Sequence, residues 1–359
     1  MKFSLKRLLL AALPIAGVSA LGGNQTVGFE SQTGSLRLAG AGFKGEILLD
    51  GSEFWGVLRT AVDLAGDFGK VTGTNLTVQI QNANEKTGKY EYAVPVSDQE
   101  YKVSEEPAVI EAHGFETSGA SANTVIIAGT IGKSKIIDQL ISSGKIDVSQ
   151  VQGKWEAYVS VLVDSPLPNV PKALVIAGSD KRGTTFGLYD ISEQIGVSPF
   201  YYWGDVPPQS HSDIFALNTV KNQGSPSIKY RGLFLNDEAP CLTNWVEENF
   251  EHGKYGAGFN RHFYSLVFEL ILRSRGNYMW PTMWGSMFNV DDYENQPLAD
   301  AFGIVMGTSH TEPLLRAKDE WPRFGEGIWQ WNINEEGIRP FFKYGVERAK
   351  PYEGIYNLG

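Results

Sequence analysis

The sequence has a single cysteine, Cys241, among its 359 residues. One cysteine cannot form an intrachain disulfide, so the fold has to be held by core packing, and a chain of this length has enough residues for that. A lone cysteine without a local signature is also a weak candidate for a catalytic nucleophile. Disulfide-stapled folds are therefore excluded.

Basic runs, metal-ligand spacings and nucleotide loops are missing as well. The formal net charge is −10 and no run of Lys or Arg is present, which argues against a nucleic-acid partner. The histidines are scattered along the chain without a recognisable ligand spacing, so neither a metal nor a cofactor is expected. The Gly-rich stretch 178–183 lacks the Gly-Lys-Ser/Thr ending of a phosphate loop. An unrelated α/β oxidoreductase is disfavoured, since no Gly-x-Gly-x-x-Gly turn follows a strand.

No apolar run is long enough to span a membrane. The longest, Leu8–Val18, falls short of the ~20 residues that cross a bilayer, so no membrane partner is expected. It follows a positively charged start made of Lys2, Lys6 and Arg7. Because Val18-Ser19-Ala20 offers a cleavage site, residues 1–20 are predicted to be the signal peptide of a secreted, extracellular protein. In a eukaryotic host, the sequons at Asn24 and Asn75 would be candidate glycosylation sites.

What the sequence does contain is a globular balance of 42% hydrophobic and 20% charged residues. It also has 9 Trp, 15 Tyr and 19 Phe, and sugar-binding clefts often contain such aromatic residues. Core packing is the commoner role of any single aromatic residue. Helix-like and strand-like patterns alternate over residues 21–206 and predict an N-terminal α/β, sandwich-like domain. Its expected helices are 54–71, 134–141 with Ser134 as its cap, and 184–195. Its expected strands lie within 35–50 and at 123–129, 158–163 and 173–177. The stretch 207–226, rich in Pro, Ser, Asn and Gly, is predicted to be a linker.

Residues 227–359 show a simpler alternation of strands and helices. Strands are expected at 230–235, 277–280, 303–306 and 355–356, and helices at 263–272, 297–302 and 337–350. This rhythm predicts parallel βα units, the first three to four of a (β/α)8 TIM barrel. Such a barrel needs roughly 250 residues. We therefore expect an incomplete catalytic barrel, truncated at its C-terminus.

Polar and aromatic residues follow each expected strand of this second part. They are Asn236, Asp237 and Glu238 after the first strand, Trp280 and Trp284 around the second, and His310 and Glu312 after the third. In a (β/α)8 barrel the C-terminal strand ends carry the active site. The structural alternative is capping of loops and helices, which Asp, Asn, Ser and Thr often provide.

Several motifs in order along the chain resemble one family. They are residues 173–184 (ALVIAGSDKRGT), 191–199 (ISEQIGVSP), 202–207 (YWGDVP), 230–240 (YRGLFLNDEAP), 277–284 (NYMWPTMW) and 307–313 (GTSHTEP). From about residue 25 onwards the sequence resembles the xylan α-1,2-glucuronidases of glycoside hydrolase family 115. The resemblance implies a secreted enzyme with an N-terminal α/β domain and a (β/α)8 barrel. It further implies inverting release of glucuronic acid, or its 4-O-methyl form, from xylan or glucuronoxylan oligosaccharides, in an enzyme that is often a homodimer.

Inverting hydrolysis requires two carboxylic groups about 6.5–9.5 Å apart, with room for a water molecule. Asp237 and Glu238 are neighbours at a strand end, where successive side chains point to opposite faces, so only one should face the substrate. We favour Asp237 for the catalytic site and Glu238 for a supporting or helix-capping role. His310 is expected to bind a sugar hydroxyl or the uronate carboxylate. Glu312 would orient His310 or cap the following helix.

The remaining candidates are substrate-binding residues. Trp280 and Trp284 are expected to stack on sugar faces, with core packing as the alternative. Arg182, next to Lys181, is expected to attract the acidic sugar, although surface solvation is the commoner role of such a pair. Glu193 lies among apolar helix neighbours and is expected to face the barrel mouth, where a buried carboxylate needs a partner. The alternative function is a non-catalytic, carbohydrate-binding remnant of such an enzyme.

Overall fold

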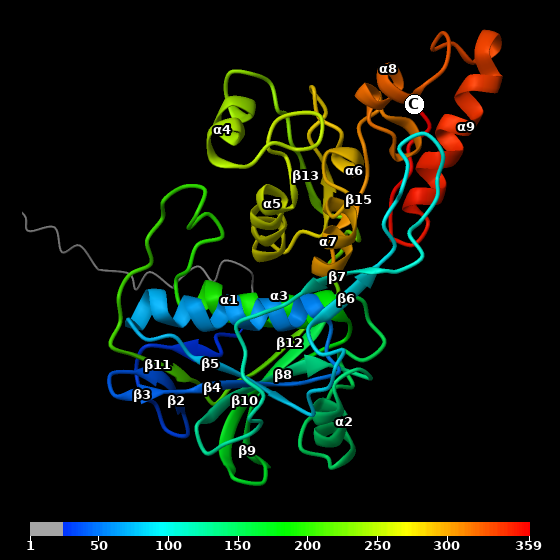
Figure 1. Ribbon diagram of the computed structural model, residues 1–359. Helices are drawn as coiled ribbons and strands as arrows, with labels where there is room; N and C mark the ends of the chain where they lie inside the picture. Colours follow the sequence, from blue (N-terminus) through cyan, green and yellow to red (C-terminus); the bar gives the residue numbers. More distant parts are fainter. Residues whose placement is uncertain (1–23) are drawn as a thin grey trace, which may run out of the picture.

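The computed structural model describes residues 24–359, so the signal peptide predicted for residues 1–20 lies outside the described residues. A six-stranded sheet, ordered β12-β9-β10-β8-β4-β5, forms the centre of the N-terminal part, residues 24–226 (Figure 1). Its strands are β4 (Glu46–Asp50), β5 (Thr77–Gln81), β8 (Thr124–Thr130), β9 (Tyr158–Leu167), β10 (Val170–Gly178) and β12 (Val220–Gln223). Strands β5, β4, β8 and β10 are parallel, while β9 is antiparallel to both its neighbours.

Helices cover both faces of this sheet. Helices α1 (Trp55–Thr72) and α3 (Lys181–Gln194) lie on one face, and α2 (Lys135–Ser142) lies on the other (Figure 1). Side chains alternate along β4, so that Ile47 and Leu49 pack in the core with α1 while Leu48 packs with α2. The predicted cap of α2 is present, because the Ser134 hydroxyl accepts a hydrogen bond from the backbone N–H of Ile137.

The stretch 207–226 is not a plain linker, contrary to our expectation. It contributes β11 to a second sheet, ordered β1-β11-β2-β3, and β12 to the edge of the first. The strands of the second sheet are β1 (Val27–Gly28), β2 (Leu36–Gly40), β3 (Phe43–Lys44) and β11 (Asp213–Ala216). Ile214 and Ala216 are buried in the core. The local composition hides these strands because their pairing partners lie far away in the sequence.

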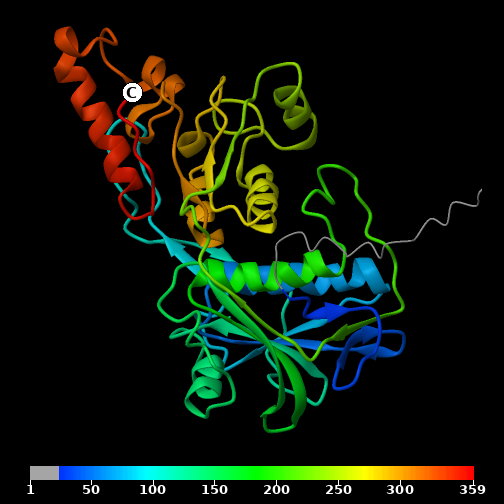
Figure 2. The ribbon, with the colours of Figure 1, turned by 180° about the vertical axis from the view of Figure 1, so that it is seen from behind.

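A hairpin of the N-terminal part reaches over to the C-terminal part. It consists of β6 (Lys89–Tyr92) and β7 (Ala108–Glu111), and its long connecting loop, residues 93–107, lies beside helix α9 (Trp331–Ala349) (Figures 1 and 2). The Tyr344 hydroxyl of α9 donates a 2.7 Å hydrogen bond to the Ser97 carbonyl. Tyr101 packs edge-on against the same Tyr344 ring. The loop is therefore a contact between the two parts of the chain.

The C-terminal part, residues 227–359, is built on three parallel strands in the order β13-β14-β15. The strands are β13 (Gly232–Phe234), β14 (Tyr278–Trp280) and β15 (Val305–Met306). Besides α9, the helices are α4 (Leu242–Asn249), α5 (Arg261–Arg273), α6 (Phe288–Asp291), α7 (Asn295–Phe302), α8 (Trp321–Phe324) and the 3-10 turns η1 (Pro313–Leu315) and η2 (Lys318–Glu320).

Two features of this part differ from expectation. Within residues 24–359 the three strands form an open sheet and no closed barrel is present. The fourth strand expected at 355–356 is reduced to a single bridge, which pairs Gly354 with Met306. None of the helices in the described range is long and apolar enough to cross a membrane.

A buried ion network joins α5 to α1 across the two parts. Arg273 donates to Asp67 at 2.7 Å and to Glu269 at 2.8 Å, and Arg59 donates to Glu269 at 3.1 Å. Arg273, Glu269 and Asp67 are all buried, so ion pairs have to replace the contacts with water that each charge loses on folding. Burial raises the pKa of Asp63, which lies in the same network, to about 6. The network thus fixes the C-terminal part on the helical layer of the N-terminal part.

Substitution of Arg273 tests this role. The change Arg273→Ala removes the cation that the buried carboxylates of Asp67 and Glu269 share, and should lower the free energy of unfolding by about 3–5 kcal/mol in urea denaturation. The matched control is Arg339→Ala, because Arg339 also pairs with a glutamate four residues earlier, Glu335, but on an exposed surface. The control should leave the urea midpoint nearly unchanged. Equal effects of the two substitutions would contradict a special role of the buried network.

Candidate functional site

The carboxyl ends of β13, β14 and β15 form the candidate site, because parallel strands bring these ends to one edge of the sheet. Asp237 lies three residues after β13 and is fully buried. Its carboxylate accepts hydrogen bonds from the backbone N–H groups of Met283 at 2.8 Å and Trp284 at 2.9 Å, and from the Ser286 hydroxyl at 3.2 Å. Asp237 therefore ties the loop after β13 to the loop after β14.

The two neighbouring carboxylates point in opposite directions, as their position at a strand end predicts. It is Glu238, however, that is exposed to solvent, whereas Asp237 points inward. Burial raises the pKa of Asp237, and the hydrogen bonds from Trp284 and Met283 act in the opposite direction. Asn236 is exposed next to Glu238. The solvent-facing carboxylate of this strand end is thus Glu238 and not the favoured Asp237.

Glu312 is a second buried carboxyl group near this edge. It accepts a 3.2 Å hydrogen bond from the backbone N–H of Lys318, the first residue of η2, a geometry that matches the capping alternative. Burial raises its pKa to about 8, and the nearby carboxylates of Glu320 and Asp237 add to the increase. A carboxyl group with this pKa is protonated at neutral pH and can donate a proton.

His310 is exposed and opens onto a cavity of about 340 Å³. The cavity is also lined by Trp329, Trp331 and Phe342. The pattern of strand ends does not predict these aromatic residues, because they lie within α9 or just before it. The density of tryptophan over residues 321–331 was the available signal.

The two tryptophans of the second strand end have different environments. The Trp280 indole N–H donates a 2.6 Å hydrogen bond to the Tyr278 hydroxyl, and the ring packs edge-on against Phe234. Trp280 is therefore half-buried, and its ring packs on a neighbouring strand. Trp284 is 46% exposed and lines a larger cavity, of about 580 Å³, together with the segment 252–257. Of the two, Trp284 offers its ring to a ligand.

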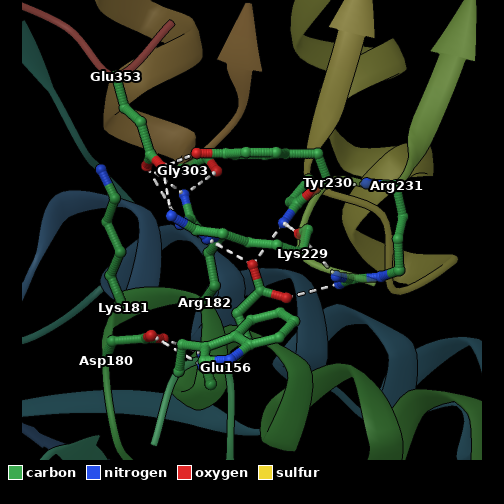
Figure 3. A network of polar contacts seen from close by, with 12 residues as sticks. Glu156, Asp180, Lys181, Arg182, Lys229, Tyr230, Arg231, Gly303 and Glu353 are labelled. Atoms are coloured by element: carbon green, nitrogen blue, oxygen red, sulfur yellow. Dashed lines mark hydrogen bonds and ion pairs between the residues drawn. The ribbon is translucent and has the colours of Figure 1, made fainter. Parts of the chain in front are cut away.

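Arg182 lies at the opposite ends of the strands, away from the candidate site (Figure 3). Its Nε lies 2.8 Å from the Glu156 carboxylate, and an Nη donates to the Gly303 carbonyl at 3.2 Å. Arg231, which directly precedes β13, also binds Glu156, at 2.6 Å. Gly303 precedes β15, so the whole network lies at the amino ends of the strands.

Glu193 is placed at the same amino ends, where it pairs at 3.0 Å with Arg275, three residues before β14. The expectation that Arg182 and Glu193 lie with the other candidates is therefore corrected. The reason is geometric, because α3 packs beneath the starts of the strands and not above their ends. Both glycosylation candidates, Asn24 and Asn75, are exposed. In the described part of the chain, no cluster of His, Cys, Asp and Glu has the arrangement of a metal site.

The raised pKa of Glu312 gives a prediction for stability against pH. The folded-state pKa of about 8 lies above the ordinary 4.5, so the folded protein binds more protons between these values. The contribution of Glu312 to stability is therefore complete below pH about 4.5 and is lost as the pH rises through about 8. Glu312→Gln cannot ionise, and urea denaturation at a series of pH values should show a flatter profile than for the parent protein.

The control for this experiment is Glu105→Gln, because Glu105 is exposed. This control should keep the pH profile of the parent protein. Parallel profiles for the parent protein and Glu312→Gln would contradict the assignment.

Comparison with known proteins places this arrangement among the glycoside hydrolases. Residues 223–359 match the family model described as Glycosyl hydrolase family 115. Over these residues the chain is similar to that family. No match was found among curated protein sequences.

A solved structure is similar to most of the chain. It is described as a family GH115 4-O-methyl-α-glucuronidase, BtGH115A, with specificity for decorated arabinogalactans. It shares 28% sequence identity with a TM-score of 0.68, over 90% of this chain and 36% of its own. The present chain therefore spans about a third of the length of that protein. A second structure, of CpGH84D, has 6% identity and a TM-score of 0.41 over 91% of this chain and 41% of its own, a likeness too slight to carry an argument.

Proposed function

We propose that the protein is an α-glucuronidase that removes glucuronic acid, or its 4-O-methyl form, from the side chains of xylan by inverting hydrolysis. The match of residues 223–359 to family 115 carries the proposal. The solved α-glucuronidase of that family supports the sugar that is released. We further propose that β13, β14 and β15 are the first strands of a (β/α)8 barrel, since they are parallel, adjacent and connected through helices.

The carboxyl ends of these strands would be the reaction centre. An inverting glycosidase uses one carboxylic acid to protonate the leaving oxygen and one carboxylate to activate water. Glu238 is exposed there and can meet a substrate, whereas the carboxylate of Asp237 is occupied by N–H and O–H donors. We therefore assign contact with the substrate to Glu238, and to Asp237 the positioning of the Trp284 loop. His310, exposed beside Glu312, would bind the carboxylate of the uronic acid.

The location and assembly of the protein are part of the same proposal. The charged and apolar pattern of residues 1–20 supports secretion to the extracellular space, where xylan is found. A homodimer is proposed from the family resemblance.

Two isosteric substitutions test the assignment of the carboxylates. Glu238→Gln should lower the rate of uronic acid release from glucuronoxylan by about 10²-fold or more, because it removes a group that exchanges protons with the reactants, and should leave the melting temperature unchanged. Asp237→Asn turns an amide N–H₂ towards groups that are themselves donors, so it should lower the melting temperature as well as the rate. Released uronic acid and thermal unfolding are measured for each protein.

The outcomes separate the alternatives. Full activity of Glu238→Gln would remove Glu238 from the reaction, and loss of activity in Asp237→Asn at an unchanged melting temperature would return the catalytic role to Asp237. Binding of glucuronoxylan without any release of uronic acid would favour the non-catalytic, carbohydrate-binding alternative. A parallel assay on decorated arabinogalactan, the substrate class of the solved relative, tests the choice of xylan.

A further inference from the structure

We propose that the cavity of about 580 Å³ next to Trp284 is a subsite for neutral sugars of the polysaccharide main chain. This inference rests on the proposed function, since it names the part of the substrate that does not react. The cavity is lined by Thr243, Glu247, His252, Lys254, Tyr255 and Trp284. Its volume is within the range of ~300–1,000 Å³ that is common for ligand sites. The lining combines an aromatic surface with hydrogen-bonding side chains, which is what a sugar ring requires.

Trp284 provides the aromatic surface of this cavity. It is 46% exposed, and its backbone N–H is fixed by the Asp237 carboxylate at 2.9 Å. The ammonium group of Lys318 lies 4.0 Å from the centre of the Trp284 ring, and Lys318 is not one of the residues that line the cavity. The C–H groups on the face of a neutral sugar ring can pack on the ring surface that remains open, and this contact removes apolar area from water.

The charges around the cavity favour a neutral ligand over the uronic acid. The ammonium group of Lys254 is paired with the Asp98 carboxylate at 2.7 Å. The hydroxyl of Tyr255 donates to the same carboxylate at 2.9 Å. The cation is thus already compensated, and the exposed carboxylate of Glu247 would repel an anionic sugar. A uronate carboxylate would find no free positive partner in Lys254.

The wall formed by residues 253–257 is rigid enough to act as a preformed site. The backbone N–H of Lys254 donates to the Asp291 carbonyl at 2.8 Å, and that of Tyr255 donates to the Asp291 carboxylate at 3.2 Å. A Cβ atom at Gly256 would lie only 2.8 Å from the Gly285 carbonyl oxygen, so a glycine is needed for this close approach. A site held in this way requires little ordering when a ligand binds.

The cavity also has the right position relative to the proposed reaction centre. Trp284 follows β14, and Asp237 at the end of β13 directly binds its backbone. Asp237 thus links the cavity to the sheet edge at which we place the reaction centre. Asp98 acts as a positioning residue, because it reaches the cavity from loop 93–107 of the N-terminal part and holds Lys254 and Tyr255.

Binding of two probes tests the subsite independently of turnover. Isothermal titration calorimetry on the whole protein would use xylohexaose as the neutral chain and 4-O-methylglucuronic acid as the acidic sugar. Trp284→Ala should weaken the binding of xylohexaose at least ~10-fold and leave that of the uronic acid unchanged. Trp284→Phe should restore most of the affinity. Phe200→Ala is the control, since Phe200 is an aromatic residue of similar exposure, 52%, that does not line the cavity.

A further variant, Asp98→Asn, removes the charge that compensates Lys254. It should weaken xylohexaose binding and strengthen binding of the uronic acid at this cavity, a shift in preference that a purely structural role would not produce. Absent binding of xylohexaose, or binding that Trp284→Ala leaves intact in a folded protein, would overturn the subsite. Trp284-dependent binding without uronic acid release from glucuronoxylan would support the subsite and contradict the proposed function.

Discussion

The Arg273 guanidinium is the group on which the arrangement of the two parts depends. It lies buried between Asp67 of α1 and Glu269 of its own helix, α5. Its removal would leave Asp67 with only Lys70, and Glu269 with only Arg59, as a cationic partner. Buried ion groups are costly, and they are tolerated only where every charge is matched. The match is possible only when α5 lies in one orientation on α1. That orientation in turn decides where β14, which follows α5, points its carboxyl end.

Below the strands a second charged network fixes the same parts. Glu156, buried in the N-terminal part, accepts from Arg231 before β13 and from Arg182 of α3, and Arg182 continues to the Gly303 carbonyl before β15 (Figure 3). The starts of two strands are thus attached to one carboxylate and its partner. Because the amino ends are held to the N-terminal part, the carboxyl ends remain free for loops that can differ in function.

Many of the helices and strands could be predicted from the sequence. The positions of strands β11 and β12 and of Arg182 in the folded chain could not. The helix at 54–71 and the Ser134 cap depend on local periodicity and a local hydrogen bond, and both were predicted. Strands β11 and β12 depend on pairing with β2 and β9, which local composition does not report. The same limitation applies to Arg182, because its role is set by which end of the strands α3 packs against.

Asp237 and Glu238 show which part of a site depends on local sequence and which part depends on distant segments. Strand alternation is a local property and predicts that Asp237 and Glu238 point in opposite directions. Which of the two reaches solvent is decided by donors from the loop after β14, at Met283 and Trp284, and these take Asp237 inward. Local reasoning therefore predicts that only one of the two faces the site, but it does not decide which of them is exposed to solvent.

The same dependence on distant segments explains why the N-terminal part is needed for the site itself. Loop 93–107 carries Asp98 to the cavity beside Trp284, where its charge compensates Lys254 and its oxygen atoms hold Tyr255. Without this carboxylate the cavity would have a free cation and would favour an acidic sugar over a neutral one. The N-terminal part thus supplies the charge that distinguishes main chain from side group. The contacts of Tyr344 with Ser97 and Tyr101 hold this loop against the C-terminal part.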